Sequence, residues 1–303
     1  MHRIQVGIVT MDGTPRQSEK NYTRLEQYVR QAVARRAQLV VAPENILDGY
    51  AACTDPDVTR ERLLEIAQTI PNGPYLARAG QLCRELSIYL VFGFLEKIGT
   101  DLFNSCAMFD PQGRIIAKYS KVHPADESYI TPGRELKPFD TPIGRVGFLI
   151  CGDRNIPANF ATLGAQGVEI VILPMDGGGG PGNAELMRRR ACENHCWIVV
   201  ANTWSAAMVS PRGELYLERY ESECVSVQRL DYSEIPKGEQ RKCFKYRRTD
   251  LYGPLAGSAE PHSHYDANGY PTELEEKSRS EHRQELRRGR NEQQADYPPV
   301  HDV

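Results

Sequence analysis

Several widespread catalytic motifs are absent from this sequence of 303 residues. It contains no G-x-S-x-G nucleophile elbow, no Walker A loop, no H-E-x-x-H zinc motif and no G-x-G-x-x-G after the first predicted strand. Histidine is scarce as well, because four of the seven histidines follow residue 256 and only His2, His123 and His195 precede it. The search for catalytic acids and bases therefore turns to carboxylates and lysines.

Long apolar runs and a charge excess are also missing. No run reaches the roughly 18–20 residues that span a bilayer, and the N-terminus lacks the basic-then-apolar build of a secretory signal. We therefore expect a cytoplasmic protein without membrane contact. The net charge of −3 gives no electrostatic reason to expect nucleic acid as a partner. The eight cysteines include no C-x-x-C pair and are expected to be thiols.

Strand-like and helix-like segments alternate over the first 230 residues, which predicts an α/β fold with helices outside the sheets. Strands are expected at 3–10, 37–43, 88–94, 146–150, 168–174, 197–201 and 224–230, a hairpin at 104–119, and helices at 17–36, 73–86, 159–166 and 185–195. Residues 256–303 are charged and nearly empty of large aliphatic side chains. They indicate a polar tail, disordered or draped over a partner, after a domain spanning 1–255. A metal site built from the histidines of this tail is the alternative, although their spacing is irregular.

Three predicted strands each end beside a residue that can do chemistry. Glu44 follows Leu39-Val40-Val41-Ala42-Pro43, Lys121 ends the second strand of the hairpin, and Cys151 follows the apolar run 146–150. Active sites in open α/β sheets lie at the carboxyl ends of strands. A buried glutamate can accept a thiol proton, a lysine can stabilise an oxyanion, and a thiol at a strand-to-helix turn can attack. The plainer interpretations are a solvated loop glutamate, a surface lysine and a small core thiol.

In combination these residues are more specific, and the sequence resembles the nitrilase superfamily of carbon–nitrogen hydrolases over about residues 4–255. Three motifs carry the resemblance: Val41-Ala42-Pro43-Glu44, Tyr119-Ser120-Lys121-Val122-His123 and Cys151-Gly152-Asp153-Arg154. The resemblance implies a four-layer α-β-β-α sandwich that pairs into a homodimer or a larger homo-oligomer.

The same resemblance implies roles for individual residues. Glu44 would be the general base, Lys121 the oxyanion stabiliser and Cys151 the nucleophile, with Glu127 as the family's second glutamate. Neither a metal nor an organic cofactor is needed for this chemistry. Between Glu127 and the following Pro-Gly, the spacing is about one residue tighter than the family's usual pattern.

Four further residues bear on the substrate. Gly152 replaces the aromatic residue or Asn that the family often has after the cysteine. Arg154 stands where N-carbamoyl-D-amino-acid hydrolases of this family have an arginine that binds the substrate carboxylate, which is a chemically suitable pairing. In the alternative interpretation Arg154 forms a structural pair with Asp153 or Glu169. Met175 and Asn202 are expected near the pocket, and the glycine run 177–180 forms either a pocket wall or a plain connector.

The sequence thus predicts a thiol hydrolase that acts on a small-molecule substrate. It would cleave a non-peptide C–N bond of a small amide or N-carbamoyl amino acid through a thioester and release ammonia. The alternatives are a nitrilase acting on a small nitrile and a catalytically silent scaffold of the same fold. Cys192, His195 and Cys196 share a helix face, but we interpret the two cysteines as part of a buried face rather than as metal ligands. Residues 247–252 resemble a family segment near the dimer interface.

Overall fold

The computed structural model describes residues 3–124, 127 and 129–256. The predicted polar tail, apart from its first residue, therefore lies outside the described residues. Twelve strands form two six-stranded sheets. The first sheet has the order β12-β1-β2-β3-β4-β5 and the second sheet the order β11-β10-β9-β8-β7-β6. No helix in the described part of the chain is long and apolar enough to cross a membrane.

The strands are β1 (Arg3–Thr10), β2 (Leu39–Val41), β3 (Tyr89–Ile98), β4 (Asp101–Phe109), β5 (Ile115–Ser120), β6 (Phe139–Thr141), β7 (Gly144–Phe148), β8 (Ile170–Pro174), β9 (Trp197–Ala201), β10 (Ala206–Val209), β11 (Leu215–Arg219) and β12 (Cys224–Asp231). The helices are α1 (Ser18–Ala34), α2 (Ala51–Thr54), α3 (Arg60–Ile66), α4 (Pro74–Leu86), α5 (Pro157–Ala165), α6 (Pro181–Asn194), α7 (Lys242–Lys245) and α8 (Gly253–Ala256). Four 3₁₀ turns complete them: η1 (Cys151–Asn155), η2 (Tyr232–Glu234), η3 (Gly238–Arg241) and η4 (Thr249–Leu251).

The two sheets share one pattern. Strands β1, β2 and β3 run parallel at the centre of the first sheet, and β7, β8 and β9 run parallel in the second. Antiparallel strands flank both centres. Strands β2 and β8 are buried along their whole length, as expected for parallel strands that are covered on both faces. The last strand, β12, returns to pair with β1 and closes the first sheet.

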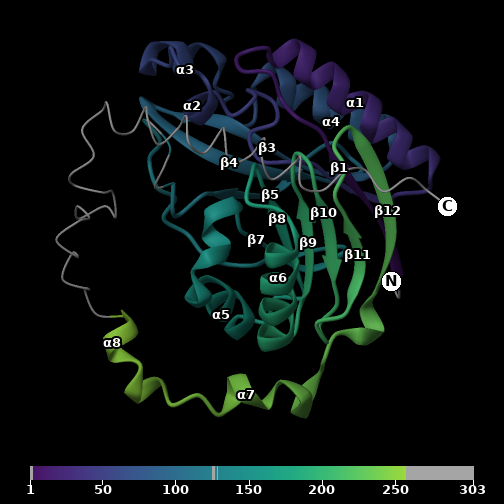
Figure 1. Cartoon of the computed structure of the whole chain (residues 1–303), viewed down its shortest axis with the longest axis vertical. Helices are drawn as coiled ribbons and strands as arrows, with labels where there is room; N and C mark the ends of the chain where they lie inside the picture. The colour runs from purple at the N-terminus through teal and green to yellow at the C-terminus, as the bar shows by residue number, and fades with distance from the viewer. Residues whose placement is uncertain (1–2, 125–126, 128, 257–303) are drawn as a thin grey trace.

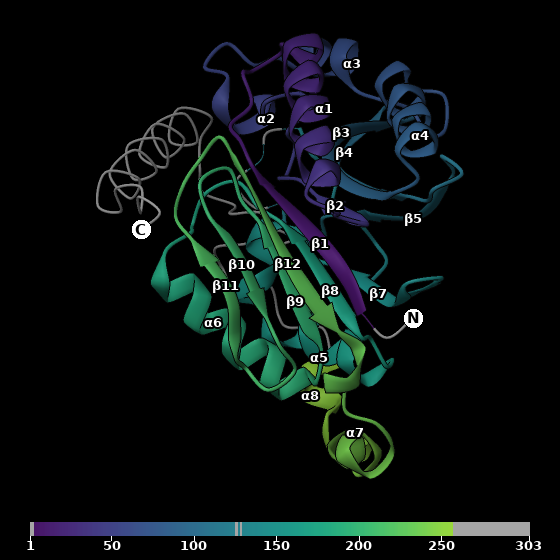
Figure 2. The same cartoon turned by 90° about the vertical axis from the view of Figure 1, so that its right-hand side faces the viewer.

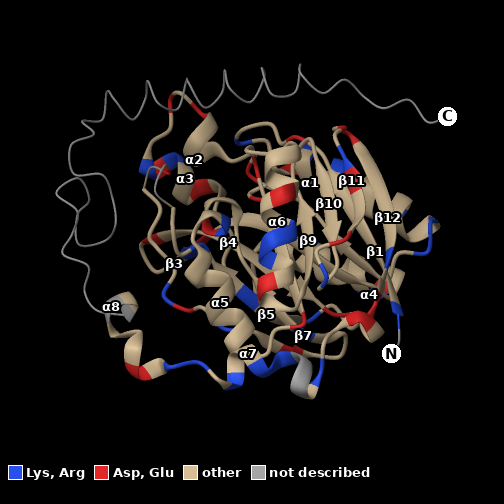
Figure 3. Cartoon of the chain, turned by 60° about the horizontal axis from the view of Figure 1, so that its bottom comes forward, with Lys and Arg blue, Asp and Glu red and all other residues tan. Residues whose placement is uncertain are grey.

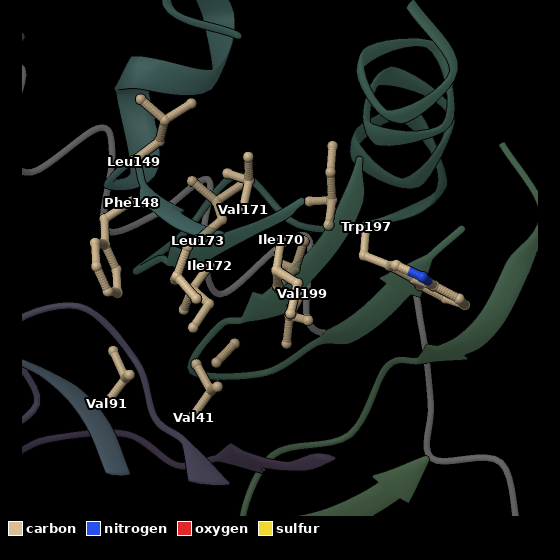
Figure 4. Packing of buried hydrophobic residues seen from close by; sticks show 14 of the residues in the cluster. Val41, Val91, Phe148, Leu149, Ile170, Val171, Ile172, Leu173, Trp197 and Val199 are labelled. Carbon is tan, nitrogen blue, oxygen red and sulfur yellow. The ribbon is translucent and has the colours of Figure 1, made fainter. Parts of the chain in front are cut away.

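Helices cover the outer face of each sheet. Helices α1 and α4 pack on the first sheet and α5 and α6 lie on the second (Figures 1 and 2). Helix α1 buries Tyr22, Leu25, Val29 and Ala32, three or four residues apart, as an amphipathic helix does. Between the sheets, Val41 and Val91 of the first sheet face Phe148 and Ile172 of the second (Figure 4). The predicted α-β-β-α sandwich is therefore confirmed.

Most of the predicted elements are present with ends shifted by a few residues. Helix α6, for example, begins at Pro181 rather than Glu185. Proline fits the first position of a helix because its missing N–H would have no partner there, and Gly180 supplies the left-handed φ of +88° just before it. Helices α2 and α3 and strands β6, β10 and β11 were not predicted from the sequence. They are short and lack an extended periodic pattern.

Candidate active site

The functional candidates lie at the carboxyl ends of strands from both sheets. Glu44 follows β2 and Lys121 follows β5 in the first sheet, whereas Cys151 follows β7 in the second. Two neighbouring strands of the second sheet contribute Asp176 after β8 and Asn202 after β9. Packing the sheets face to face therefore brings five strand ends to one edge of the sandwich. This is the edge at which α/β folds generally place their ligands.

Lys121 lies between two buried carboxylates. Its Nζ is 2.8 Å from Glu44 Oε1 and 2.5 Å from Glu127 Oε1. The Tyr50 hydroxyl accepts a third, longer hydrogen bond of 3.3 Å. The side chains of Lys121, Glu44 and Glu127 are 5%, 0% and 1% exposed. Because an ammonium group has three N–H donors, these three acceptors occupy all of them.

The Glu44 carboxylate is held at both oxygens. Asn104 Nδ2, from β4, donates to Glu44 Oε1 at 2.7 Å and to Glu127 Oε2 at 2.9 Å. The backbone N–H of Asp176 donates to Glu44 Oε2 at 2.9 Å. Residues from both sheets therefore fix the orientation of this carboxylate, so its free oxygen lone pairs point in defined directions.

Burial and charge shift the proton affinities of this cluster. Burial raises the pKa of Glu44, and the attraction of Lys121 opposes that effect without cancelling it. For Lys121 burial acts in the opposite direction, but Glu127 and Glu44 outweigh it and raise its pKa well above the usual range. Lys121 is therefore an ammonium group at neutral pH. Glu44 binds a proton more readily than a solvated glutamate, which suits a general base.

Cys151 begins the turn η1 with a left-handed φ of +42°. Its Sγ lies 3.6 Å from Arg154 Nη1 and 3.8 Å from the carbonyl oxygen of Asp176. Burial, followed by the negative charge of Glu44, raises the pKa of the Cys151 thiol to about 11, although Lys121 and Arg154 act in the opposite direction. The thiol is therefore protonated at neutral pH and needs a base to become a nucleophile.

Arg154 points towards the thiol and not to either of the structural partners considered from the sequence. Its Nη2 donates to the carbonyl oxygen of Gly178 at 3.0 Å. Asp153 instead accepts from the Tyr119 hydroxyl at 2.7 Å, and Glu169 accepts from the backbone N–H of Arg145 at 2.9 Å. The glycine run thus positions this guanidinium.

Gly152, Met175 and Asn202 occupy different surroundings. A Cβ atom on Gly152 would meet only the His123 carbonyl oxygen, at 3.8 Å, so there is room beside the thiol. Met175 is fully buried in the core between the sheets. Asn202 is also fully buried, and its amide bonds to the backbone N–H and C=O of Gly177 at 3.1 and 3.3 Å. It therefore anchors the glycine run.

The prediction for Cys192 and Cys196 requires a correction, because α6 ends at Asn194 and only Cys192 lies within it. Cys196 is buried, as expected, but Cys192 is exposed, so the prediction of one shared buried face is wrong. The inward face of α6 instead contains Met187, Ala191 and Asn194. The described residues contain no group of three or more His, Cys, Asp or Glu side chains that could hold a metal ion.

Sequence reasoning missed several residues of the site. Asn104 had a detectable signal, a polar side chain within an apolar strand. Asp176 had none, because its contribution to Glu44 is made by the backbone N–H. Tyr50 is brought to Lys121 by its own left-handed φ of +54°, which the residue type does not predict.

Comparison with known proteins shows the family of the chain. The family model described as carbon-nitrogen hydrolase matches residues 5–237. The omega-amidase NIT2 of Homo sapiens is 30% identical over 260 residues, covering 77% of this chain and 91% of the relative. A nitrilase of Pyrococcus abyssi is 30% identical over 266 residues, covering 82% and 99%.

Solved structures share the fold at low sequence identity. One of them is a double mutant of the amidase from Nesterenkonia sp. AN1 in complex with acrylamide. This structure has a TM-score of 0.69 and 19% identity, covering 84% of this chain and 97% of that one. Because the family model spans more than half of the sequence, the chain belongs to the carbon–nitrogen hydrolase family of the nitrilase superfamily and is a hydrolase of C–N bonds.

Proposed function

We propose that this protein is an amidase that releases ammonia from a small amide or N-carbamoyl amino acid through a thioester on Cys151. One observation carries the proposal: a buried ammonium group, Lys121, bridges Glu44 and Glu127 at the strand ends that also bring in Cys151. A buried cluster of this kind is costly to assemble, and its members match the roles that acyl transfer requires.

In the proposed mechanism, Glu44 accepts the proton of Cys151, whose raised pKa makes that transfer necessary. The thiolate adds to the carbonyl carbon, and Lys121 and the Gly152 N–H stabilise the oxyanion. Glu44 returns the proton to the leaving ammonia, leaving an acyl thioester. Water then gives a proton to Glu44 and adds to the thioester carbonyl carbon. The C–S bond breaks, the acid product leaves, and Glu44 returns the proton to the Cys151 sulfur. Glu127 and Asn104 orient Lys121 and Glu44 throughout.

The substrate proposal rests on Arg154. Its Nη1 is 3.6 Å from the thiol, so a carboxylate bound there would lie close to the reacting carbon. In N-carbamoyl α-amino acids and in monoamides of four-carbon dicarboxylic acids, only two atoms separate the carbonyl carbon under attack from the carboxylate carbon. The names of the human and Nesterenkonia relatives, an omega-amidase and an amidase, support an amide substrate. The nitrilase of Pyrococcus abyssi supports the alternative, hydrolysis of a small nitrile.

Ammonia release should be measured with an N-carbamoyl amino acid, a dicarboxylic monoamide, a neutral amide and a nitrile of matched length. We expect the two acidic amides to be the best substrates. Replacing Cys151→Ala should lower turnover at least about 10³-fold, whereas Cys224→Ala, at another partly exposed thiol, should not. Preference for the nitrile would support the nitrilase alternative. Absence of turnover on all four would favour the silent scaffold.

The role of Arg154 can be tested separately. Loss of a hydrogen bond to a charged group costs about 1.5–3 kcal/mol, so Arg154→Ala should raise KM for acidic amides by roughly 10- to 150-fold. The neutral amide should be little affected. An equal loss on acidic and neutral amides would argue against carboxylate binding.

We also propose that the chain forms a homodimer through its C-terminal segment, residues 238–256. This segment lies at the α5 end of the sandwich, where Arg241 Nη2 donates to the Gly164 carbonyl oxygen at 3.0 Å (Figure 1). Basic residues follow one another along it (Figure 3). Four large apolar side chains there are exposed to solvent: Tyr246 is 64%, Leu251 61%, Tyr252 42% and Leu255 83% exposed.

Such a row of exposed apolar residues is typical of an interaction surface. Light scattering after size exclusion should give a dimer for the wild type and a monomer for Leu251→Glu. The control is Leu215→Glu, at a less exposed leucine on β11, which should stay dimeric. A monomeric wild type would refute the proposal.

A further inference from the structure

Asp153 is a fully buried carboxylate that the proposed chemistry does not use. Its Oδ2 accepts hydrogen bonds from the backbone N–H of Ile150 at 3.0 Å and from the Tyr119 hydroxyl at 2.7 Å. Its Oδ1 accepts from the backbone N–H of His123 at 3.0 Å and lies 3.0 Å from His123 Nδ1. A buried carboxylate is stable only when it is satisfied in this way.

The partners of Asp153 belong to both sides of the site. Ile150 immediately precedes Cys151 in the second sheet. Tyr119 and His123 flank Lys121 in the first sheet, two residues before and two after it. Tyr119 and Lys121 also point to the same side of the chain, because side chains alternate along a strand. One carboxylate thus connects the backbone next to the thiol with the segment that carries the ammonium group.

The turn at Cys151 depends on such support. A left-handed φ at a residue other than glycine costs about 1–2 kcal/mol, and Cys151 has a φ of +42°. Asp153 closes the turn twice, through its side chain to the Ile150 N–H and through its own N–H to the Ile150 carbonyl oxygen at 3.0 Å. Asn159 adds support by donating to the Asp153 carbonyl oxygen at 2.9 Å.

We propose that Asp153 is a positioning residue that sets the spacing between the Cys151 thiol and the Lys121 ammonium group. The inference rests on the proposed function, in which these two groups act on the same carbonyl. Attack requires the thiol, and oxyanion stabilisation requires the lysine at a fixed distance from it. A misplacement of about 1 Å can cost about 10²-fold in rate. Weakening the hydrogen bonds of Asp153 should therefore reduce oxyanion stabilisation by Lys121 more than it reduces the reactivity of the Cys151 thiol.

Two reagents separate these steps without any knowledge of the natural substrate. Iodoacetamide alkylates a thiolate at a saturated carbon: a C–S bond forms, iodide leaves and no oxyanion arises. With p-nitrophenyl acetate the thiolate adds to a carbonyl, passes through an oxyanion and expels p-nitrophenolate, leaving an acetyl thioester. In both reactions a base takes the thiol proton. The ratio of the two rates at Cys151 therefore reports the placement of Lys121.

The variants are Asp153→Asn and Tyr119→Phe. The Asp153 carboxylate accepts hydrogen bonds at both oxygens, whereas asparagine accepts at one oxygen and donates through its N–H₂ group. Asparagine therefore cannot satisfy all four contacts. Tyr119→Phe removes the hydroxyl that donates to Asp153, keeps the carboxylate and serves if Asp153→Asn does not fold. The control is Tyr232→Phe, because the Tyr232 hydroxyl donates to the carbonyl oxygen of Ile143 at 2.6 Å, away from these residues.

We expect acetylation to fall about tenfold in Tyr119→Phe and about 10²-fold in Asp153→Asn, with alkylation within about threefold of wild type and no change in the control. Parallel losses of both rates in Tyr119→Phe, or no loss of acetylation in that variant, would overturn the positioning role. Mass spectrometry of the labelled wild type keeps the two proposals distinct. Labelling at cysteines other than Cys151 would reject the proposed nucleophile itself.

Discussion

Replacing Lys121→Met should destabilise the protein in a strongly pH-dependent way. The substitution leaves Glu44 and Glu127, 0% and 1% exposed, without their shared cation. Removing one partner of a buried ion pair costs about 3–5 kcal/mol, a large part of the roughly 5–15 kcal/mol that stabilises a typical domain. Asn104 continues to donate to both carboxylates, but it carries no charge.

The sign of the pH dependence follows from the direction of the pKa shift. Burial raises the pKa of Glu44 above its value in the unfolded chain, and Lys121 opposes that rise. Without Lys121 the pKa of Glu44 rises further. A carboxyl group with a raised pKa favours folding at a pH below its unfolded pKa, and this contribution is lost as the pH rises through the folded pKa. The variant should therefore be least destabilised near pH 5 and most destabilised near pH 8.5. Its free energy of unfolding should fall by about 1.4 kcal/mol per pH unit while Glu44 stays protonated in the folded state.

Urea unfolding followed by circular dichroism at pH 5.5, 7.0 and 8.5 measures this effect. Lys118→Met is a matched control on β5, three residues before Lys121. Lys118 Nζ is 2.8 Å from Glu96 Oε2, but its side chain is 32% exposed, and Ser105 also donates to that oxygen. Glu96 is 3% exposed, but it keeps the Ser105 donor and loses only one partly exposed cation, so the control should lose less stability than Lys121→Met. Equal losses in both variants, or a loss at Lys121 that does not grow with pH, would refute the reasoning. Adding Glu44→Gln to Lys121→Met should reduce the pH dependence.

Three other substitutions test local features of the site. Gly178→Ala should cost about 1–2 kcal/mol of stability, because φ is +60° there. It should also raise KM for acidic amides, since the new Cβ would lie 2.2 Å from Arg154 Nη2; an unchanged KM would contradict this. Tyr50→Phe leaves one N–H of Lys121 without its acceptor and should cost about 1–3 kcal/mol in urea unfolding. Its kcat/KM should change less than tenfold, because we expect the oxyanion to replace the tyrosine hydroxyl; a fall beyond about 10²-fold would make Tyr50 a catalytic group. Gly152→Ala should change stability by less than about 0.5 kcal/mol and raise KM for bulky amides more than for small ones; a large stability loss would show that the space is filled.

The local sequence determined most of the elements and the residues with reactive groups. Strand alternation predicted that Ala117, Tyr119 and Lys121 share one face, and the structure buries all three. The spacing of Leu25, Val29 and Ala32 predicted α1 within two residues at either end. These patterns are readable because the periods of helix and strand follow from local backbone geometry.

Tertiary structure decided how those groups meet. Glu44 and Lys121 come from the first sheet and Cys151 from the second, so their proximity depends on packing of the two sheets. The direction of Arg154 depends on a carbonyl of the glycine run, which lies 24 residues away in sequence. The shifted pKa values follow from the same packing, because burial and the approach of charges from distant segments produce them. Sequence motifs thus identified the reactive groups. The fold determined the distances between these groups and their proton affinities, on which the proposed chemistry depends.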